Sequence, residues 1–349
     1  FAAMEAAIEG ARESVLVQFY TIAVDATAER FIEALRRAHR RGVRVCLLYD
    51  PLGSHRFERR WVKGLRREGL EVKPFSFGRR SPVRQLKLNF RNHRKVLVVD
   101  GREAFFGGFN VADMYRGRHP RLSPWRDTHV RLKGPGTRDL AESFAEDWTA
   151  AGGEVPPGIG EFKPAPAGEA VCAVFPTGPS RRGNRATLLV LGLIQGARER
   201  LWISTPYLVP NEAVFIALQA AVLRGVEVVI LTAAQRDHYA SHLAGYYYAR
   251  ELRSVGVTVM RYREGFLHQK AILVDDRWAA IGSMNLDNRS LQLNFEMTVL
   301  FVDAATVRSV EAMLRADLAR SDESQGEWTG LGETRQLLCC AARLFAPLL

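Results

Sequence analysis

The chain has 349 residues, 47% of them apolar and 25% charged, so it is long enough for two globular domains or one large duplicated unit. No apolar run reaches the ~18 residues of a transmembrane helix, and the four cysteines show no Cys-x-x-Cys spacing, which argues against a bilayer span, a disulfide framework and a zinc site. The formal net charge of +11 favours an anionic partner, either a nucleic acid or a membrane rich in acidic lipid.

The first half alternates strand-forming and amphipathic segments. Residues 12–20 and 42–49 are predicted to form strands on either side of a helix over residues 27–40. Residues 65–72 contain the end of a second helix and the start of a third strand, separated by Gly69. Such alternation is typical of an α/β fold, in which a mixed β-sheet is flanked by helices.

A basic stretch follows over residues 74–92. Equivalent residues of the two halves are 187 positions apart before this stretch, at Leu65 and Leu252, but only 175 apart after it, at His93 and His268. The stretch therefore contains an insertion of twelve residues in the first half. Its cations are Arg79, Arg80, Arg84, Lys87 and Arg91. Two interpretations are open: a solvated basic loop, or a loop that faces anionic lipid head groups at the mouth of a site.

A polar motif follows the insertion, with a lysine two residues after a histidine, an aspartate seven, a glycine fourteen and an asparagine seventeen residues after it. Its members are His93, Lys95, Asp100, Gly107, Gly108 and Asn110. In an extended strand, alternation would place His93 and Lys95 on the same face, while the apolar residues 96–99 anchor the strand in the core. Asp100 and Gly101 suit a tight hairpin turn.

A stretch rich in Gly and Pro over residues 151–170 is predicted to be a linker. Beyond it the pattern of the first half returns, with strands within residues 198–207 and 225–232 and a helix over residues 213–224. We therefore expect two similar α/β domains. The bounds of the first domain, the linker, the second domain and an apolar tail are 1–150, 151–170, 171–325 and 326–349.

The polar motif also returns in the second half, with the same spacing at every position. Its members are His268, Lys270, Asp275, Gly282, Ser283 and Asn285. A buried strand would repeat its apolar residues, but it has no reason to repeat His, Lys and Asn in register. The duplication therefore predicts two half-sites, related by a pseudo-two-fold axis, that form one shared active centre.

The last segment, residues 337–349, is apolar but too short to span a bilayer. We expect it to dock on the protein's own core, and the alternative is a position in the membrane interface. The cysteine content favours a reduced, cytosolic environment. The sequence leaves open whether a membrane anchor precedes Phe1.

Together the two motifs offer two imidazoles, two ammonium groups and two amides. One imidazole can attack phosphorus while the other protonates the leaving alcohol, and the lysines and asparagines can stabilise charge on the non-bridging oxygens. The small residues before each asparagine allow the backbone to approach a ligand closely. Asp100 and Asp275 are expected to support turns or strand ends at least as much as the chemistry. These groups predict a phosphodiester site that uses neither a metal ion nor a cofactor.

Each motif is followed by an acidic residue, Asp127 in the first half and Glu296 in the second. Either carboxylate can fix the tautomer of a motif histidine, and the alternative is an ordinary surface acid. Asp127 lies seventeen residues after Asn110, whereas Glu296 lies eleven after Asn285. The sequence therefore leaves the equivalence of the two acids open.

On these residues the chain resembles the phospholipase D superfamily, whose signature His-x-Lys-x4-Asp-x6-Gly-(Ser/Gly)-x-Asn occurs twice in one chain. The resemblance covers nearly all of residues 1–325, and the segments 204–211, 265–270 and 282–296 resemble bacterial cardiolipin synthases in particular. It implies a two-step phosphatidyl transfer through a phosphohistidine. His93 is then the nucleophile and His268 the general acid and later the base, although the similarity of the halves permits the reverse.

The same resemblance implies anionic phospholipid substrates, with glycerol or phosphatidylglycerol as the acceptor, and an enzyme bound peripherally to the cytoplasmic face of the bacterial inner membrane. Transfer to phosphatidylglycerol makes cardiolipin, whereas transfer to water makes phosphatidic acid. A nuclease of the same superfamily is a further alternative, but no array of aromatic residues interleaved with Lys and Arg suggests a base-stacking surface, so nucleic acid is not the expected partner. A non-enzymatic membrane-binding module would have no use for two intact motifs.

Overall fold

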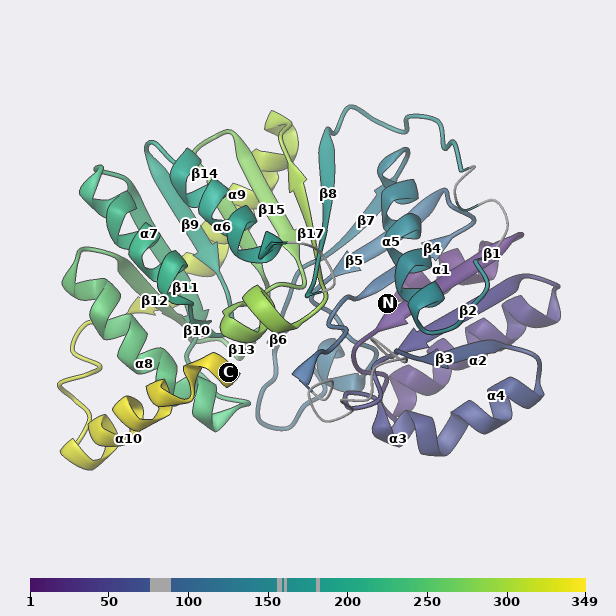
Figure 1. Ribbon diagram of the computed structural model, residues 1–349, viewed down its shortest axis with the longest axis horizontal. Helices are drawn as coiled ribbons and strands as arrows, with labels where there is room; N and C mark the ends of the chain where they lie inside the picture. Colours follow the sequence, from purple (N-terminus) through teal and green to yellow (C-terminus); the bar gives the residue numbers. More distant parts are fainter. Residues whose placement is uncertain (76–88, 156–158, 160–161, 180–182) are drawn as a thin grey trace. The chain divides into compact units, whose positions relative to one another are not determined.

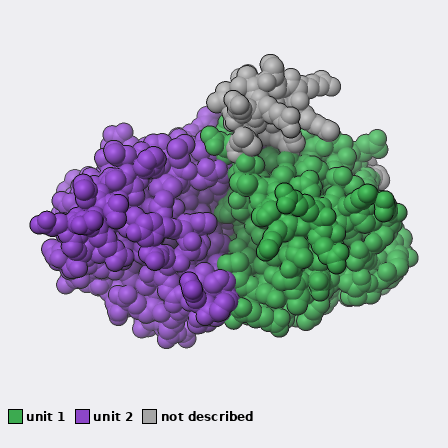
Figure 2. Space-filling view, turned by 90° about the horizontal axis from the view of Figure 1, so that it is seen from below, with its two compact units in different colours: residues 1–118, 129–169 green, residues 119–128, 170–349 purple. Residues whose placement is uncertain are grey.

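The computed structural model describes residues 1–75, 89–155, 159, 162–179 and 183–349 (Figure 1). Four cations of the basic insertion, Arg79, Arg80, Arg84 and Lys87, lie outside the described residues. The fifth, Arg91, lies 3.9 Å from the carboxylate of Asp50. The chain divides into two compact units, which Figure 2 distinguishes by colour. Unit 1 comprises Phe1–Arg118 and His129–Glu169, and unit 2 comprises His119–Thr128 and Ala170–Leu349.

Unit 1 is built on a six-stranded mixed sheet with the strand order β3-β2-β1-β4-β5-β7. Its strands are β1 (Ser14–Phe19), β2 (Arg44–Tyr49), β3 (Glu71–Pro74), β4 (Val96–Val99), β5 (Glu103–Gly107) and β7 (His129–Lys133). Its α-helices are α1 (Ala2–Gly10), α2 (Ala26–Arg40), α3 (His55–Phe57), α4 (Lys63–Arg67) and α5 (Gly136–Ala150). A π-helical stretch, Glu58–Val62, joins α3 to α4, and a 3-10 helix spans Asp113–Arg116.

Unit 2 is built on an eight-stranded mixed sheet with the strand order β18-β12-β11-β9-β14-β15-β17-β8. Its strands are β8 (Cys172–Thr177), β9 (Arg200–Ser204), β11 (Glu227–Ala233), β12 (Thr258–Tyr262), β14 (Ala271–Val274), β15 (Trp278–Gly282), β17 (Glu296–Phe301) and β18 (Ser321–Glu323). Its α-helices are α6 (Arg185–Gly196), α7 (Glu212–Leu223), α8 (Tyr239–Ser254), α9 (Ala304–Leu318) and α10 (Glu333–Leu344). Outside this sheet, β10 (Leu208–Val209) pairs with β16 (Leu286–Asp287), and β6 (Trp125–Arg126) pairs with β13 (Phe266–Leu267). A π-helix, Arg289–Leu293, follows β16, and a 3-10 helix, Ala346–Leu348, follows α10.

The sequence repeat appears as a repeat of strand order. In unit 1, β1 pairs parallel with β2 and antiparallel with β4, which continues into the hairpin with β5. In unit 2, β9 pairs parallel with β11 and antiparallel with β14, which continues into the hairpin with β15. The two α/β halves that the sequence predicted are confirmed, and the helices expected over residues 27–40 and 213–224 are α2 and α7.

The central strand and its neighbouring helix show why these segments fold as they do. All six residues of β1 are buried between β2 and β4, which suits a nearly continuous apolar sequence. Helix α2 begins after Asp25, whose carboxylate accepts a hydrogen bond from the Ala28 N–H at 3.0 Å. Its buried face carries Phe31, Ile32 and Leu35. Burial of such side chains contributes about 1.5–3 kcal/mol each, more than the cap, which contributes about 1 kcal/mol.

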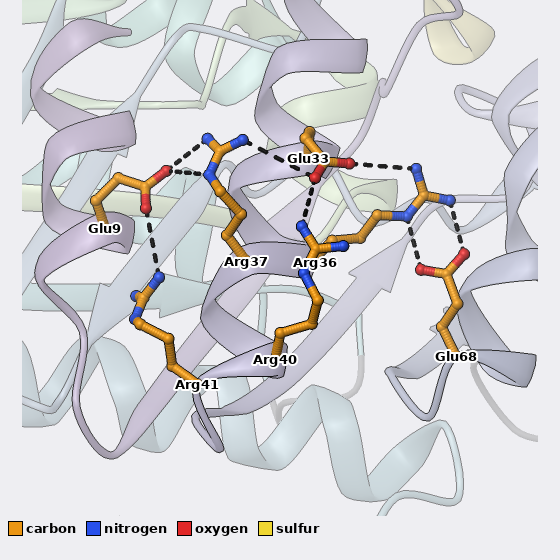
Figure 3. A network of polar contacts seen from close by, with 7 residues as sticks. All are labelled: Glu9, Glu33, Arg36, Arg37, Arg40, Arg41 and Glu68. Carbon is orange, nitrogen blue, oxygen red and sulfur yellow. Dashed lines mark hydrogen bonds and ion pairs between the residues drawn. The ribbon is translucent and has the colours of Figure 1, made fainter.

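The exposed face of α2 is a network of ion pairs (Figure 3). Four arginines in and just after this helix each meet a glutamate. The pairs are Arg36 with Glu68 at 2.7 Å, Arg37 with Glu9 at 2.5 Å, Arg40 with Glu33 at 2.7 Å and Arg41 with Glu9 at 3.3 Å. Each exposed pair contributes only about 0–1 kcal/mol. Their effect is mainly to neutralise a run of positive charge, so this face is not an open anion-binding surface.

The apolar tail forms α10, which packs against α8. Cys339, Ala342 and Ala346 are buried in a cluster with Val209 and Leu243. The expectation that this segment docks on the protein's own core is confirmed for its small residues, whereas Leu337, Leu344 and Phe345 are exposed. In the described part of the chain, no helix is both long and apolar enough to cross a membrane.

Candidate active site

The histidine and lysine of each motif lie in the segment that leads into β4 or β14. The expectation that the strand itself includes them is wrong. The backbone ladders from β1 and β9 reach only Val96 and Ala271. In the second motif, backbone hydrogen bonds still hold the residues before Ala271, because the His268 N–H donates to the Arg126 carbonyl oxygen at 2.7 Å and the Lys270 carbonyl oxygen accepts from the Gly282 N–H at 3.3 Å. Side-chain contacts add to these.

In unit 1 the residue between His and Lys anchors the motif to a helix. Arg94 is 1% exposed and donates a hydrogen bond to Asp147 Oδ2 on α5 at 2.5 Å. Gln18 Nε2 on β1 and Asn92 Nδ2 donate to the same oxygen at 2.6 and 2.8 Å. This buried carboxylate therefore joins the motif, the central strand and α5.

Unit 2 repeats the arrangement with different residue types. Gln269 Nε2 donates to Asp317 Oδ2 on α9 at 2.8 Å, and Arg126 donates to both oxygens of the same carboxylate at 2.7 Å. Asp147 and Asp317 were not identified from the sequence. Their signal was an aspartate in the core-facing stripe of a helix, three residues after Phe144 and Leu314 respectively, where a charge persists only if it is paired.

Asp100 and Asp275 tie the motif hairpin to the central strand in the same way in both units. Each follows the motif strand in left-handed backbone, with φ of 51° and 49°. Asp100 accepts hydrogen bonds from the N–H groups of residues 12–14 at 2.8–3.0 Å, and Asp275 accepts them from residues 198–200 at 2.9–3.3 Å. Burial alone would raise the pKa of Asp275, but these donors outweigh it and lower this pKa. Both aspartates are thus placed to hold the strand ends.

The small residues before Asn285 accommodate a neighbouring strand. A Cβ on Gly282 would lie 2.1 Å from the carbonyl oxygen of Met297 on β17, so only glycine fits there. Close packing of β17, not the expected approach of a ligand, is thus what this glycine permits. Ser283 Oγ donates to Glu296 Oε2 at 2.5 Å, which orients the buried acid. Gly108 follows β5 at the equivalent position of the first motif and lacks this hydroxyl.

The motif asparagines are buried, and part of their hydrogen-bonding capacity is used by other residues of the protein. Asn110 Oδ1 accepts from the Thr21 N–H at 3.0 Å, and its Nδ2 donates to the Tyr115 hydroxyl at 2.6 Å. Asn285 Nδ2 donates to Asp287 at 3.1 Å. Because a side-chain amide has two N–H groups, each asparagine has a second one with which to donate to a phosphate oxygen.

A cavity of about 20 Å³ lies beside the second motif in unit 2. Ser204, Asn285 and Thr298 line it, and each carries a buried side-chain oxygen (Oγ, Oδ1 and Oγ1) that has no hydrogen-bond partner within the described part of the chain. Lys270 also lines it. The cavity has the size and the polar partners for one ordered water, which would support the asparagine and the lysine from behind.

His268 is held by Asp127 within unit 2. Its Nδ1 lies 2.7 Å from Asp127 Oδ2 and 3.0 Å from Lys270 Nζ. One ring nitrogen cannot donate to a carboxylate and accept from an ammonium at once. Because the ammonium also donates to the carbonyl oxygen of His268, we assign the Nδ1 proton to the charge-assisted bond with Asp127. The Nε2 atom then carries the lone pair that attack on phosphorus or proton abstraction requires.

In unit 1 the motif side chains meet an aromatic ring. Lys95 Nζ donates to the carbonyl oxygen of His93 at 2.6 Å and lies 5.6 Å from the centre of the Tyr20 ring. The same ring contacts the imidazole of His93 edge-on, with the ring centres 5.2 Å apart. His93 is half-buried, whereas Lys95 is buried.

Burial sets the protonation of the second motif. It lowers the pKa of His268 to about 4, with the Lys270 ammonium adding to the effect and Asp127 opposing it. It also lowers the pKa of Lys270 to about 8, against the pull of Asp127, so the ammonium persists at neutral pH. Burial alone would raise the pKa of Asp127, but the His268 ring, Lys270 and the Thr128 N–H outweigh it and lower this pKa. At pH 7 an ionised Asp127 therefore faces a neutral imidazole and a charged lysine.

The sheet register shows whether Asp127 and Glu296 are equivalent. The residue that pairs with the motif glycine across the sheet is His129 in the first half and Thr298 in the second. Asp127 and Glu296 each lie two residues before it, so they occupy equivalent positions. The different spacing in sequence comes from a longer connection before Asp127.

The free energy of unfolding is expected to fall as the pH drops from 7 to 5. Burial lowers the pKa of both His268 and His242 to about 4, whereas in the unfolded chain each titrates near 6.5. Between these values the unfolded chain binds protons that the folded chain excludes, so stability is complete above about pH 6.5 and is lost toward pH 4. Denaturant unfolding at pH 7 and 5 measures the difference. His242→Gln should remove part of the fall, with the exposed His55→Gln as control; equal free energies at both pH values would contradict the prediction.

Comparison with known proteins adds an independent observation. Residues 4–120 and 190–318 match a family model described as cardiolipin synthase, PLD-like domain. The chain is 46% identical over 351 residues to cardiolipin synthase A of Pseudomonas aeruginosa, which covers 100% of this chain and 71% of that protein. It is 44% identical over 351 residues to cardiolipin synthase A of Pseudomonas fluorescens, with 100% and 73% covered. A phosphatidylserine synthase structure from Haemophilus influenzae aligns with a TM-score of 0.74 at 16% identity, covers 100% of this chain and 93% of that one, and shows the shared fold.

Proposed function

This chain belongs to the cardiolipin synthase family of proteins with phospholipase-D-like domains, and we propose that it is a phosphatidyltransferase that makes cardiolipin. The phosphatidyl donor is phosphatidylglycerol or another phospholipid, and the acceptor is a hydroxyl of phosphatidylglycerol. The observation that carries the proposal is the complete duplicated motif, in which Asp127 holds His268 in the tautomer that phosphoryl chemistry needs.

In the first step the imidazole of His93 attacks the phosphorus of the donor. A bond forms between nitrogen and phosphorus, the bond from phosphorus to the head-group oxygen breaks, and His268 gives that oxygen a proton. His268 is neutral before substrate binds, and the anionic phosphodiester that arrives beside it favours the imidazolium that this step requires. The products are the free alcohol and a phosphatidyl group on His93.

In the second step His268 acts as the base. Its Nε2 atom takes the proton of the acceptor hydroxyl, the hydroxyl oxygen bonds to phosphorus, and the bond to His93 breaks. The neutral tautomer set by Asp127 suits this step directly. The same tautomer would also serve a nucleophile, so trapping of the intermediate, described below, decides between the two assignments.

The remaining motif residues stabilise charge. Lys95, Lys270, Asn110 and Asn285 are assigned to the non-bridging oxygens of the phosphodiester, where negative charge grows in the transition state. The buried Lys270, with its pKa lowered to about 8, keeps its charge at neutral pH and acts in a poorly solvated place, where its effect on an anion is large.

The partners follow from this chemistry. The substrates are anionic phospholipids, with glycerol or phosphatidylglycerol as the acceptor according to the direction of transfer. We place the enzyme at the cytoplasmic face of the bacterial inner membrane, associated with the surface. The net charge of +11 supports attraction to acidic lipid.

Incubation of the protein with phosphatidylglycerol vesicles tests the proposal. We expect cardiolipin and free glycerol in equal amounts, because each transfer releases one head group, and chromatography of the lipids with an assay for glycerol measures both. Phosphatidic acid as the sole product would replace the synthase with a hydrolase. Cleavage of single-stranded DNA, with no change in the lipid, would point to a nuclease instead.

A further inference from the structure

Helix α10 and the turn that follows it present large apolar side chains to solvent. The exposed residues, with their exposed fractions, are Leu337 (70%), Leu338 (45%), Leu344 (75%), Phe345 (60%) and Leu348 (56%). Within α10, Leu337, Leu338, the exposed Ala341 and Leu344 lie at positions i, i+1, i+4 and i+7, which is the spacing of a single helix face. Phe345 at the C-cap and Leu348 in the following 3-10 helix continue the exposed apolar surface. We name this set the α10 stripe.

The opposite face of α10 is buried and carries small residues. Cys339, Ala342 and Ala346 pack against Leu243 and Ala244 of α8. A helix that serves only to cover its own core buries its large apolar residues, whereas α10 buries small residues and leaves its large apolar ones exposed. Single exposed leucines are ordinary, but several on one face indicate a surface that binds something apolar.

Two arginines of α10 lack an acidic partner. In the part of the chain that the structure describes, neither Arg335 nor Arg343 forms an ion pair with a carboxylate. Arg335 lies 5.8 Å from the centre of the Tyr246 ring and Arg343 5.0 Å from that of Tyr247. The arginines of α2 are instead neutralised by glutamates (Figure 3). Unpaired arginines and half-buried tyrosines beside an apolar stripe match the composition of helices that lie in a membrane interface.

The chain end beside the α10 stripe is hydrogen-bonded to the segment that follows the second motif. The N–H of Arg289 donates to the carbonyl oxygen of Leu349 at 2.9 Å, and its Nη1 atom donates to that of Leu348 at 3.3 Å. Arg289 begins the π-helix four residues after Asn285. A lipid surface in contact with the stripe would therefore lie close to the segment that carries a motif asparagine.

We propose that α10 is an interfacial helix that docks the enzyme on a bilayer containing anionic phospholipid, an inference that rests on the proposed function for the nature of the surface. Its twelve residues extend about 18 Å, too short to cross the hydrocarbon core, so the helix lies along the surface. The α10 stripe enters the boundary of the acyl chains, and Arg335 and Arg343 meet lipid phosphates. Glu333 lies in the first turn, where a negative charge suits the helix end.

A second copy of the chain is the other candidate for an occupant. Five side chains of this size bury about 300–600 Å² when they are fully covered. A stable homodimer needs about 800 Å² from each partner. The α10 stripe is therefore small for a dimer interface but sufficient for a helix that inserts into lipid.

Vesicle sedimentation tests the inference with two matched triple variants of the full chain. One variant, Leu337→Gln with Leu344→Gln and Phe345→Gln, changes the three most exposed large side chains of the stripe. The control, Leu188→Gln with Ile216→Gln and Leu223→Gln, changes three apolar residues on α6 and α7 that are 60%, 54% and 85% exposed. We expect the α10 variant to bind phosphatidylglycerol vesicles about tenfold or more weakly than the control, since interfacial binding follows the buried apolar area.

Two further experiments measure the role of the arginines in binding anionic lipid and the effect of the α10 variant on cardiolipin synthesis. Arg335→Gln with Arg343→Gln should reduce the preference for phosphatidylglycerol over phosphatidylcholine vesicles. The α10 variant should lose cardiolipin synthesis on vesicles but keep it with short-chain phosphatidylglycerol below its critical micelle concentration. Vesicle binding equal to that of the control would overturn the inference, and so would a lipid-free dimer that only the α10 variant loses. A wild-type protein that binds vesicles through α10 but makes no cardiolipin would support the inference while refuting the proposed function.

Discussion

His93→Ala and His268→Ala are each expected to abolish formation of cardiolipin. The first change removes the nitrogen that bonds to phosphorus, so no phosphatidyl intermediate can form. The second removes the group that moves protons in both steps, and loss of a general acid–base costs about 10²–10⁴-fold in rate. Initial rates on phosphatidylglycerol vesicles measure the loss, with the exposed His55→Ala as the matched control. Near-normal turnover by either motif variant would refute the proposal that both histidines act on one phosphodiester.

The loss must be separated from misfolding. Removal of the His268 ring leaves the Oδ2 atom of the buried Asp127 with only the longer hydrogen bond from Trp125 Nε1, at 3.3 Å. The second variant at this position is therefore His268→Gln, which retains a donor for the carboxylate. Its unfolding curve should match that of the wild type more closely while its activity stays lost. Acid quenching during turnover of phosphate-labelled donor, followed by peptide mapping, then locates the intermediate. Label on His93 supports the proposed roles, and label on His268 reverses them.

Asp147→Ala is expected to lower the free energy of unfolding by about 3–5 kcal/mol, the cost of breaking a buried ion pair by removal of one member. The carboxylate accepts from Arg94 at 2.5 Å, from Gln18 at 2.6 Å and from Asn92 at 2.8 Å, so the change removes the acceptor that a guanidinium and two amide donors share in the core. Because Arg94 lies between His93 and Lys95, activity should fall as well. Denaturant unfolding and the vesicle assay measure the two effects.

The control for this prediction lies on the same helix. Glu142→Ala on α5 removes an exposed ion pair with Arg138, whose atoms are 2.7 Å apart, and should cost no more than about 0.5 kcal/mol. Asp147→Asn retains an acceptor and should fall between the two. If Asp147→Ala were as mild as Glu142→Ala, the buried network would contribute little and the motif would be positioned by other contacts.

Much of the fold could be predicted from the sequence because its signals are local. The alternation of strands with helices such as α2 depends on the periodicity of neighbouring residues, and it appeared in both halves at the expected places. The hairpin turns after β4 and β14 followed from the aspartates at their tips. The strand starts were missed, because the point at which a ladder ends depends on the partner strand, and β1 and β9 are far away in the sequence.

The acidic residues near the motifs show the same difference between what local sequence predicts and what only tertiary contacts reveal. Asp127 and Glu296 were candidates, but only the pairing of β5 with β7 and of β15 with β17 made them equivalent. Asp147 and Asp317 were missed, although each lies in the core-facing stripe of its helix, because the buried partner that pairs with the charge comes from a distant segment. Periodicity in the sequence predicts which face of a helix or strand a residue occupies. It does not predict which residue of another element that side chain will contact.

The sequence by itself determined the duplicated α/β pattern and the kinds of group that do the chemistry, because periodicity and residue identity are written along the chain. Only the tertiary structure decided how those groups are held. Asp127 meets His268 across 141 residues, Asp147 meets Arg94 across 53, and Asp317 meets Arg126 across 191. Such contacts depend on the packing of helices and strands, and the burial that this packing creates sets the protonation of His268.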